Sequence, residues 1–408
     1  MGVNFKVLAL SALATISHAS PLLYPRATDS NVTYVFTNPN GLNFTQMNTT
    51  LPNVTIFATG GTIAGSSADN TATTGYKAGA VGIQTLIDAV PEMLNVANVA
   101  GVQVTNVGSP DITSDILLRL SKQINEVVCN DPTMAGAVVT HGTDTLEESA
   151  FFLDATVNCR KPVVIVGAMR PSTAISADGP LNLLQSVTVA TSPKARDRGA
   201  LIVMNDRIVS AFYASKTNAN TVDTFKAIEM GNLGEVVSNK PYFFYPPVKP
   251  TGKTEVDIRN ITSIPRVDIL YSYEDMHNDT LYSAIDNGAK GIVVSLDHSQ
   301  YGPHLSKTPP EHLHQNTNPN KKQIAGSGSG SVSTPFSAAM EDITTKHNIP
   351  IVASTRTGNG EVPSSAESSQ IASGYLNPAK SRVLLGLLLA QGKSIEEMRA
   401  VFERIGVA

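Results

Sequence analysis

The sequence of 408 residues has little net charge and no strongly basic segment, and its longest N-terminal apolar run is short. Thirty lysines and arginines stand against 34 aspartates and glutamates, so the formal charge is −4 and a nucleic-acid-binding surface is not expected. The apolar run at residues 7–16 is too short to span a bilayer, so we expect no membrane partner. The hydrophobic content of 41% is typical of an ordinary globular protein with a large core.

Two common catalytic arrangements are also missing. The chain has no Ser-His-Asp order and no Gly-x-Ser-x-Gly elbow. The polar segment 297–322 holds half of the eight histidines, but no cysteine or clustered carboxylate completes a metal site with them. These histidines are His298, His304, His312 and His314. We therefore expect a solvent-exposed loop insertion there and no bound metal.

Residues 1–19 have the pattern of a secretory signal peptide, with Lys6, the apolar run and small residues around Ala19. Asn-x-Ser/Thr sequons agree with export by a eukaryote. Asn53 adjoins a predicted core strand, so we expect it to stay unmodified. The sequons expected to carry glycans are Asn31, Asn43, Asn48, Asn260 and Asn278. Residues 20–50 are expected to form a glycosylated, loosely held extension.

The chain has only two cysteines, Cys129 and Cys159. In an oxidising compartment they can pair, which would stabilise the fold by roughly 3–4 kcal/mol in the chain-entropy model. The alternative is a pair of buried free thiols.

Short apolar, β-branched runs alternate with helical patterns through the first half of the chain. This alternation predicts a doubly wound α/β domain with a flavodoxin-like parallel sheet over residues 51–245. The strands are expected at 54–58, 102–107, 135–140, 163–166 and 200–204, with a hairpin at 207–215. Helices are expected at 83–94, after a cap at Asp111 or Ser114, at 145–154 and after Asp178.

A stretch rich in proline and lysine, residues 246–265, is expected to link this domain to a second one. The second is a smaller α/β domain over residues 266–408, interrupted by the insertion 297–325. Its strands are expected at 267–271, 291–296 and 349–354. Its helices are expected at 281–289, 336–346, 382–390 and 395–405.

Polar, glycine-containing turns follow three of the predicted strands. They are Thr59-Gly-Gly-Thr62, Gly108-Ser-Pro-Asp111 and Gly142-Thr-Asp-Thr145. Each turn alone would be unremarkable as a loop. Because the carboxyl ends of parallel strands meet at one edge of a sheet, where α/β proteins bind ligands, the three together predict a site.

The residue types in these turns favour amide hydrolysis or acyl transfer through a threonine nucleophile. A threonine hydroxyl is a weak nucleophile that needs a base or a charged partner. Thr143 stands beside Asp144, and Lys216 lies in a polar loop, where a desolvated lysine can act as a general base. Ser109, Asp111 and Asp144 are candidates to hold an amino-acid head group.

Residues 59–64 and 136–146 resemble the two signature stretches of the bacterial-type (type II, periplasmic) L-asparaginases. The likeness extends from Leu51 to the end of the chain. It includes residues 166–173, 176–180, 215–218, 354–360 and 376–378. The resemblance implies a homotetramer without a cofactor that hydrolyses L-asparagine to L-aspartate and ammonia, with L-glutamine as a weaker substrate.

The resemblance also implies roles for individual residues. Thr62 would be the nucleophile that forms an aspartyl ester, and Tyr76, on the loop 66–82, would close over it and assist proton transfer. Thr143, Asp144 and Lys216 would activate the nucleophile or water. Substrate contacts would come from Gly61, Ser109, Thr143, Asp144, Ala168, Ser331 and Glu367, the last donated across a subunit interface. The pair Cys129 and Cys159 matches a disulfide of this class.

Two departures from the family pattern bear on these expectations. Pro110 stands where the family usually has a glutamine or glutamate that contacts the amino end of the substrate, and proline offers no side-chain donor or acceptor there. The insertion 297–325 is foreign to the bacterial pattern. The alternatives are a glutaminase-asparaginase of broad specificity and a catalytically inactive relative that binds amino acids.

Overall fold

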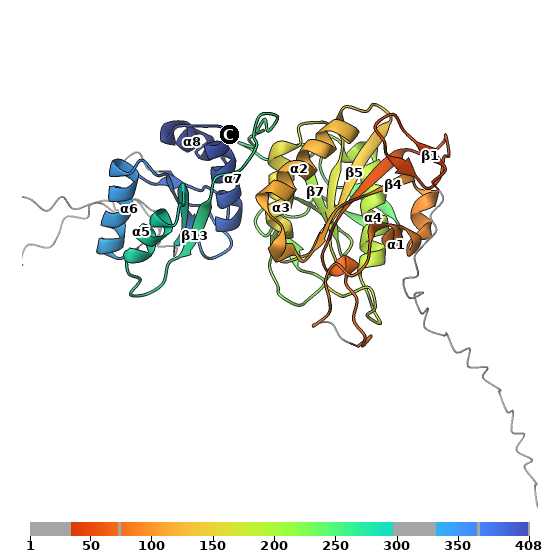
Figure 1. Ribbon diagram of the computed structural model, residues 1–408, viewed down its shortest axis with the longest axis horizontal. Coiled ribbons are helices and arrows are strands. Elements are labelled where there is room, and N and C mark those ends of the chain that lie inside the picture. The colour runs from red at the N-terminus through yellow and green to blue at the C-terminus, as the bar shows by residue number, and fades with distance from the viewer. Residues whose placement is uncertain (1–33, 72–74, 297–331, 365–367, 407–408) are drawn as a thin grey trace, which may run out of the picture.

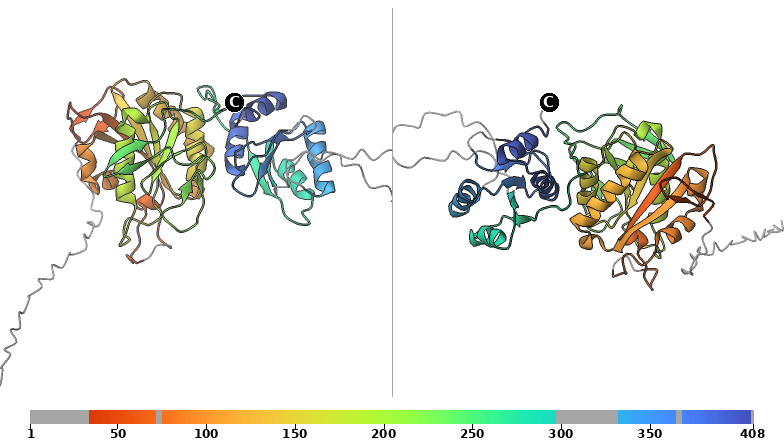
Figure 2. Two further views of the ribbon diagram at one scale, coloured as in Figure 1. Left: turned by 180° about the vertical axis from the view of Figure 1, so that it is seen from behind. Right: turned by 45° about the horizontal axis from the view of Figure 1, so that its top comes forward.

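The structure is a computed structural model that describes residues 34–71, 75–296, 332–364 and 368–406. The predicted signal peptide, Asn31 and the histidine-rich insertion 297–325 lie outside these residues. Two α/β units are visible, one around a ten-stranded sheet and one around a four-stranded sheet, and a single connecting segment joins them (Figures 1 and 2).

The large sheet has five parallel strands at its centre, in the order β4-β3-β5-β6-β7. The order of these strands along the chain is therefore 2-1-3-4-5, which confirms the predicted doubly wound, flavodoxin-like fold. Their bounds are β3 (Asn53–Gly60), β4 (Asn98–Val107), β5 (Met134–Thr140), β6 (Val163–Val166) and β7 (Ala200–Met204). Strands β6 and β7 begin and end as predicted, whereas β4 begins four residues earlier.

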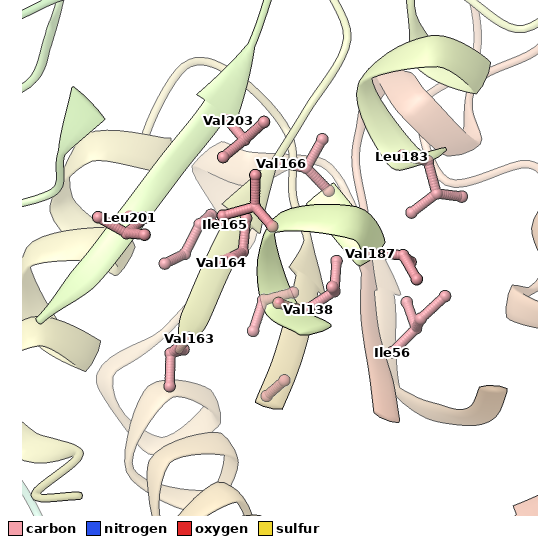
Figure 3. Close-up of a cluster of buried hydrophobic side chains, with 14 of the residues drawn as sticks. Ile56, Val138, Val163, Val164, Ile165, Val166, Leu183, Val187, Leu201 and Val203 are labelled. Atoms are coloured by element: carbon pink, nitrogen blue, oxygen red, sulfur yellow. The ribbon is translucent and has the colours of Figure 1, made fainter. Parts of the chain in front are cut away.

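Strands β5, β6 and β7 are buried on both faces, which is why they are rich in Val, Ile, Leu and Ala. Figure 3 shows this core, in which Leu183 and Val187 of α4 (Gly179–Thr191) lie over the strands. Helix α4 and α1 (Ile83–Asp88) cover one face of the sheet, and α2 (Ser114–Ile124) and α3 (Leu146–Thr156) cover the other (Figure 1).

Two helix predictions need correction. The helix expected over 83–94 ends at Asp88, and a separate 3₁₀ turn, Pro91–Asn95, follows because a proline cannot continue the hydrogen-bond ladder. The cap of α2 is neither Asp111 nor Ser114. Thr113 takes this place, because its hydroxyl accepts the backbone N–H of Ile116 at 3.3 Å.

The sheet also has antiparallel strands at both edges, which the sequence did not predict. One edge carries β8 (Arg207–Ser210), β11 (Gly234–Val237) and β12 (Lys240–Phe243). The hairpin expected at 207–215 is wrong in its bounds, because β8 is the second arm of a hairpin whose first arm is β7. The alternating pattern of β11 is short and lies between turns, so it was missed.

At the other edge, β1 (Phe36–Thr37) and β2 (Asn43–Phe44) form an antiparallel pair that joins β4 through Phe44. Residues 34–50 are therefore not a loosely held extension, and the sheet begins before the predicted boundary at residue 51. Leu42 and Phe44 are 4% and 1% exposed. These two apolar side chains anchor a segment whose composition is otherwise polar.

The small sheet is parallel throughout, in the order β13-β14-β15-β16. Its strands are β13 (Val267–Tyr271), β14 (Gly291–Leu296), β15 (Ile351–Thr355) and β16 (Ile371–Ala372), and the two-residue β16 was not predicted. Its helices are α5 (Asp279–Asp286), α6 (Thr334–Lys346), α7 (Pro378–Ala390) and α8 (Ile395–Phe402). Helix α7 packs on the sheet and faces α3 of the large unit (Figure 1).

The connecting segment is packed between the two units. Val256, Ile258 and Ile261 are buried in one apolar cluster with Phe151 of α3 and Leu384 of α7. A cluster that draws on both units and on the segment between them makes their separation costly.

An ion pair also holds this segment to α3. Lys253 Nζ lies 2.6 Å from Asp154 Oδ1, and their side chains are only 5% and 2% exposed. The same carboxylate oxygen accepts the backbone N–H of Ala200 at 2.7 Å. Breaking such a buried pair leaves an uncompensated charge.

Cys129 and Cys159 form a disulfide, with their Cα atoms 5.6 Å apart, so the alternative of two free thiols is wrong. The bond joins the π-helical segment Asn125–Cys129, which directly follows α2, to the connection after α3. None of the helices in the described part of the chain is long and apolar enough to cross a membrane.

We predict that Lys253→Met lowers the free energy of unfolding by about 3–5 kcal/mol, because Asp154 stays buried without its cation. Lys249→Met is the matched control in the same segment. Lys249 pairs with Glu255, and both side chains are about half exposed, so this change should cost less than about 1 kcal/mol. Urea unfolding of both variants measures the difference, and equal midpoints would contradict the prediction.

Candidate active site

The candidate site lies at the carboxyl ends of β3, β4 and β5, where the order of the parallel strands reverses. In a 2-1-3-4-5 sheet the helices on either side of this switch point leave in opposite directions, which opens a crevice above the strands. The three polar turns predicted from the sequence follow these three strands. The structure therefore brings them together.

Adjacent glycines allow the turn after β3 to contact its neighbours through backbone atoms. Gly61 has φ +80°, and a Cβ atom on it would lie 2.2 Å from the backbone nitrogen of Gly142. A Cβ on Gly142 would in turn lie 2.9 Å from the Ser109 hydroxyl oxygen. Only glycine fits at these contacts. Thr62 and Thr143, each directly after one of these glycines, are thereby placed on adjoining turns.

Thr62 begins the 3₁₀ turn Thr62–Ala64 and is 5% exposed. Its hydroxyl lies 2.6 Å from the hydroxyl of Tyr76, and either oxygen can donate. Thr62 and Tyr76, to which the family resemblance assigns neighbouring roles, are therefore in direct contact through their hydroxyl groups.

The loop that carries Tyr76 is tied to the core at several points. Ser66 and Lys77 exchange two backbone hydrogen bonds, and Gly79 donates its N–H to the Gly61 carbonyl at 3.1 Å. The side chain of Thr173 accepts the Ser67 N–H at 3.0 Å. These bonds hold the described part of the loop, on both sides of residues 72–74, over the turn that contains Thr62.

A second cluster joins Lys216 to the turn after β5. Lys216 Nζ donates to Thr143 Oγ1 at 3.1 Å and to Asp144 Oδ1 at 2.7 Å. Lys216 is 17% exposed and Asp144 is 66% exposed, so the pair lies at a boundary between protein and solvent. Lys216 Nζ is the donor in both contacts, so one amino group joins the side chains of Thr143 and Asp144.

The predicted substrate contacts lie beside these two clusters. Ser109 is buried, and its hydroxyl accepts the Asp144 N–H at 3.1 Å. Ala168, just after β6, is fully buried near Ile63. Asp111 is exposed at the end of the 3₁₀ turn Ser109–Asp111, and Pro110 is exposed in that turn. Ser331 and Glu367 lie outside the described residues.

Asp178, which the sequence indicated only as the start of a helix, also shapes the site. Its carboxylate accepts the backbone N–H groups of Met169 and Arg170, both at 3.0 Å, and so holds the turn after Ala168. Within the part of the chain that the structure describes, no group of three or more His, Cys, Asp and Glu side chains is arranged to bind a metal ion.

Three further residues near Lys216 were missed as site residues. Glu147, in the first turn of α3, accepts the backbone N–H of Lys216 at 2.5 Å, and Asn377 and Lys380 of the small unit contact the same segment. Glu147 directly follows the signature stretch 136–146, and Asn377 lies in the stretch 376–378. Their spacing of 230 residues gives no local signal that they meet.

His141 lies under the turn and is completely buried. Its Nδ1 is 2.7 Å from the Gly142 carbonyl oxygen, so Nδ1 carries the proton and donates. Burial lowers the pKa of His141 to about 4, because the charged imidazolium would be desolvated. The imidazole is therefore neutral at physiological pH.

Residues 53–249 match the family described as "Asparaginase, N-terminal", and residues 324–402 match the "Glutaminase/Asparaginase C-terminal domain". The chain is 45% identical over 360 residues to "Probable L-asparaginase 1" of Schizosaccharomyces pombe, a match that covers 88% of this chain and 91% of that protein. The chain belongs to the asparaginase family.

This asparaginase-family chain is also 45% identical to "L-asparaginase 2" of Bacillus subtilis, with 86% of each protein covered. A solved structure similar to it is that of the probable cytoplasmic L-asparaginase from Campylobacter jejuni. The TM-score is 0.75 at 36% sequence identity, over 86% of this chain and 99% of that one.

We predict that acid destabilises the folded protein by about 3 kcal/mol through His141 alone. The imidazole has its ordinary pKa of 6.5 in the unfolded chain and a pKa of about 4 in the folded one. The unfolded state therefore binds the proton first, so this stability is present above pH 6.5 and is lost as the pH falls towards 4.

Thermal unfolding of the wild type and His141→Gln between pH 7 and pH 4 measures this effect. As the pH falls from 7 to 4, the wild type should lose more stability than His141→Gln, which has no imidazole to protonate. His277→Gln, which replaces an exposed histidine, is the control. A difference that is constant over this range for His141→Gln would show that the charge on His141 does not matter.

Proposed function

We propose that the protein is an L-asparaginase that hydrolyses L-asparagine to L-aspartate and ammonia through a covalent intermediate on Thr62. The observation that carries the proposal is the pair of hydrogen-bonded clusters, Thr62 with Tyr76 and Thr143 with Lys216, on adjoining turns of an asparaginase-family fold. One cluster supplies a nucleophile and the other a charged group that activates a hydroxyl.

In the first half of the reaction, Thr62 Oγ1 attacks the side-chain amide carbon of L-asparagine. The hydroxyl of Tyr76, 2.6 Å away, accepts the Thr62 proton and passes a proton to the departing amide nitrogen. A C–O bond forms and the C–N bond breaks, so ammonia leaves and Thr62 carries an aspartyl ester. The buried position of Thr62 keeps bulk water from competing with this step.

In the second half, water attacks the ester carbonyl. Thr143 Oγ1, which accepts a hydrogen bond from Lys216 Nζ at 3.1 Å, takes a proton from the attacking water and passes its own hydroxyl proton on to Thr62 Oγ1. The bond between the acyl carbon and Thr62 Oγ1 breaks, and Thr62 regains its proton as L-aspartate leaves. Asp144 pairs with Lys216 and holds its Nζ towards Thr143.

Substrate binding would use Gly61, Ser109, Thr143, Asp144 and Ala168, together with Ser331 and Glu367. Ser109 and Asp144 are already in contact, and they would hold the α-carboxylate and α-amino groups of the substrate. L-glutamine is expected to be a weaker substrate. Pro110 offers no side-chain hydrogen bond beside Ser109 and Asp144, so this position is expected to affect the affinity for the substrate or the preference between the two amides.

We predict that Thr62→Ala lowers kcat for L-asparagine by roughly 1,000-fold or more, because the covalent route is lost. Lys216→Met should lower kcat strongly as well. Ammonia release from L-asparagine and L-glutamine measures both effects. Thr71→Ala removes an exposed threonine hydroxyl from the loop 66–82 and should leave kcat unchanged.

The same assay separates the alternatives. Comparable kcat/KM values for the two amides would favour a glutaminase-asparaginase of broad specificity. Binding of either amide without ammonia release by the wild type would favour an inactive relative and overturn the proposal.

We also propose that the protein is exported after removal of residues 1–19, carries N-linked glycans and assembles as a homotetramer. The disulfide between Cys129 and Cys159 supports an oxidising compartment. Asn48 and Asn260 are exposed, as a glycan acceptor must be. Asn43 and Asn278 are half-buried, and Asn53 accepts a hydrogen bond from the side chain of Asn98 at 2.9 Å. Oligomer formation is supported by the edge strand β13, which leaves Ile269 and Tyr271 exposed.

Expression of the full chain in a eukaryotic host tests this second proposal. We expect the protein in the medium, without residues 1–19, with glycans on Asn48 and Asn260 and with Asn53 bare, as judged by peptide mass spectrometry. Light scattering should give four times the chain mass. A full-length chain that stays inside the cell and carries no glycan would contradict export.

A further inference from the structure

The segment that carries Lys216 is held by side chains of the small unit. Lys380, in the first turn of α7, is 1% exposed. Its Nζ donates to the carbonyl oxygen of Phe212 at 2.8 Å and to that of Ala214 at 2.6 Å. Ala214 is two residues before Lys216, so this buried lysine fixes the backbone that leads into the candidate catalytic lysine.

Asn377, which caps α7, makes the next contact along the same segment. Its side-chain amide donates to Ser215 Oγ at 3.0 Å and to Glu147 Oε1 at 2.9 Å, while its carbonyl oxygen accepts the Lys380 N–H at 3.0 Å. The other oxygen of Glu147 accepts the backbone N–H of Lys216. Glu147 thus connects the cap of α7 to Lys216 itself.

These contacts fix Lys216 at two ends. Its backbone nitrogen is bound to Glu147 in the first turn of α3, and its Nζ is bound to Thr143 and Asp144 in the turn just before that helix. The backbone and the amino group of Lys216 are therefore both held by α3 and the turn that leads into it. Helix α7 of the small unit contacts the same segment through the side chains of Asn377 and Lys380.

The buried position of Lys380 carries a desolvation cost. Burial lowers the pKa of Lys380 to about 8, because the ammonium is taken out of water. A methionine has nearly the same length and would avoid this desolvation cost, although it would leave two carbonyl oxygens without their donor. The lysine is therefore costly for the fold and useful for the geometry of residues 212–216.

We propose that Glu147, Asn377 and Lys380 are positioning residues that hold Lys216 against Thr143, so that the small unit takes part in catalysis through α7. The proposal rests on the function proposed above for Lys216. None of the three residues needs to touch the substrate. A displacement of Lys216 Nζ by about 1 Å would be enough to slow the chemical step by about 100-fold.

The test compares Lys380→Met with a control that breaks a different contact between α7 and the large unit. Arg382 of α7 pairs with Glu148 of α3 at 2.8 Å, and neither contacts residues 212–216 through a hydrogen bond that the structure shows. We expect Lys380→Met to lower kcat for L-asparagine by about 10- to 100-fold with a much smaller change in KM. Arg382→Met should change kcat by less than about twofold.

A second measurement reports on Lys216 without relying on turnover. Trace acetylation with acetic anhydride, followed by peptide mass spectrometry, gives the reactivity of Lys216 in each folded protein. Release of Lys216 from Thr143 and Asp144 should raise its acetylation rate in Lys380→Met and leave it unchanged in Arg382→Met. Glu147→Gln, at a half-buried site, should behave like Lys380→Met and replaces it where that variant does not fold.

The outcomes separate the two proposals. A wild type that hydrolyses neither amide overturns the proposed function, and the acetylation rates still decide whether Lys216 is held from α7. If the wild type is active but Lys380→Met and Glu147→Gln match Arg382→Met in kcat and in Lys216 acetylation, the positioning role is overturned. A lower melting temperature with unchanged kcat and acetylation would show that Lys380 serves only to dock α7.

Discussion

The backbone contact between Gly61 and Gly142 is the constraint on which the candidate site depends. A single added methyl group at Gly61 would lie 2.2 Å from the Gly142 nitrogen, so the turns after β3 and β5 approach as closely as two peptide chains can. Thr62 and Thr143 follow these glycines directly. The close approach of the two backbones therefore places these two threonines on adjoining turns. Ser109, which contacts Gly142 from the turn after β4, completes the same packing.

Two buried charged groups join the large unit to the segments packed against it. Asp154 pairs with Lys253 and holds the connecting segment on α3, while Lys380 gives its protons to two carbonyl oxygens. Both cations lie between the large and small units. Because a buried charge tolerates little displacement of its partners, these contacts make the relative position of the two units part of the geometry around Lys216.

The predictions that proved wrong share a physical cause. In the described part of the polar segment before residue 51, Leu42 and Phe44 are the only large apolar side chains that are buried, and the edge strands β8, β11 and β12 are only four residues long. Thr113 caps α2 in place of the predicted Asp111 or Ser114. Asp111 is not available as the cap because it belongs to the 3₁₀ turn Ser109–Asp111. Local composition sets which residues can cap or pair, and the surrounding structure selects among them.

Sequence alone determined the parallel core, the three polar turns at its edge and the identity of the residues in both clusters. Buried parallel strands need unbroken β-branched runs, and such runs can be seen without a structure. Tertiary structure decided which groups surround Lys216, since Glu147 and Asn377 lie 230 residues apart and meet only where α3 packs against α7. It also decided that His141 is neutral, because its desolvation comes from the whole fold and not from its neighbours in the chain.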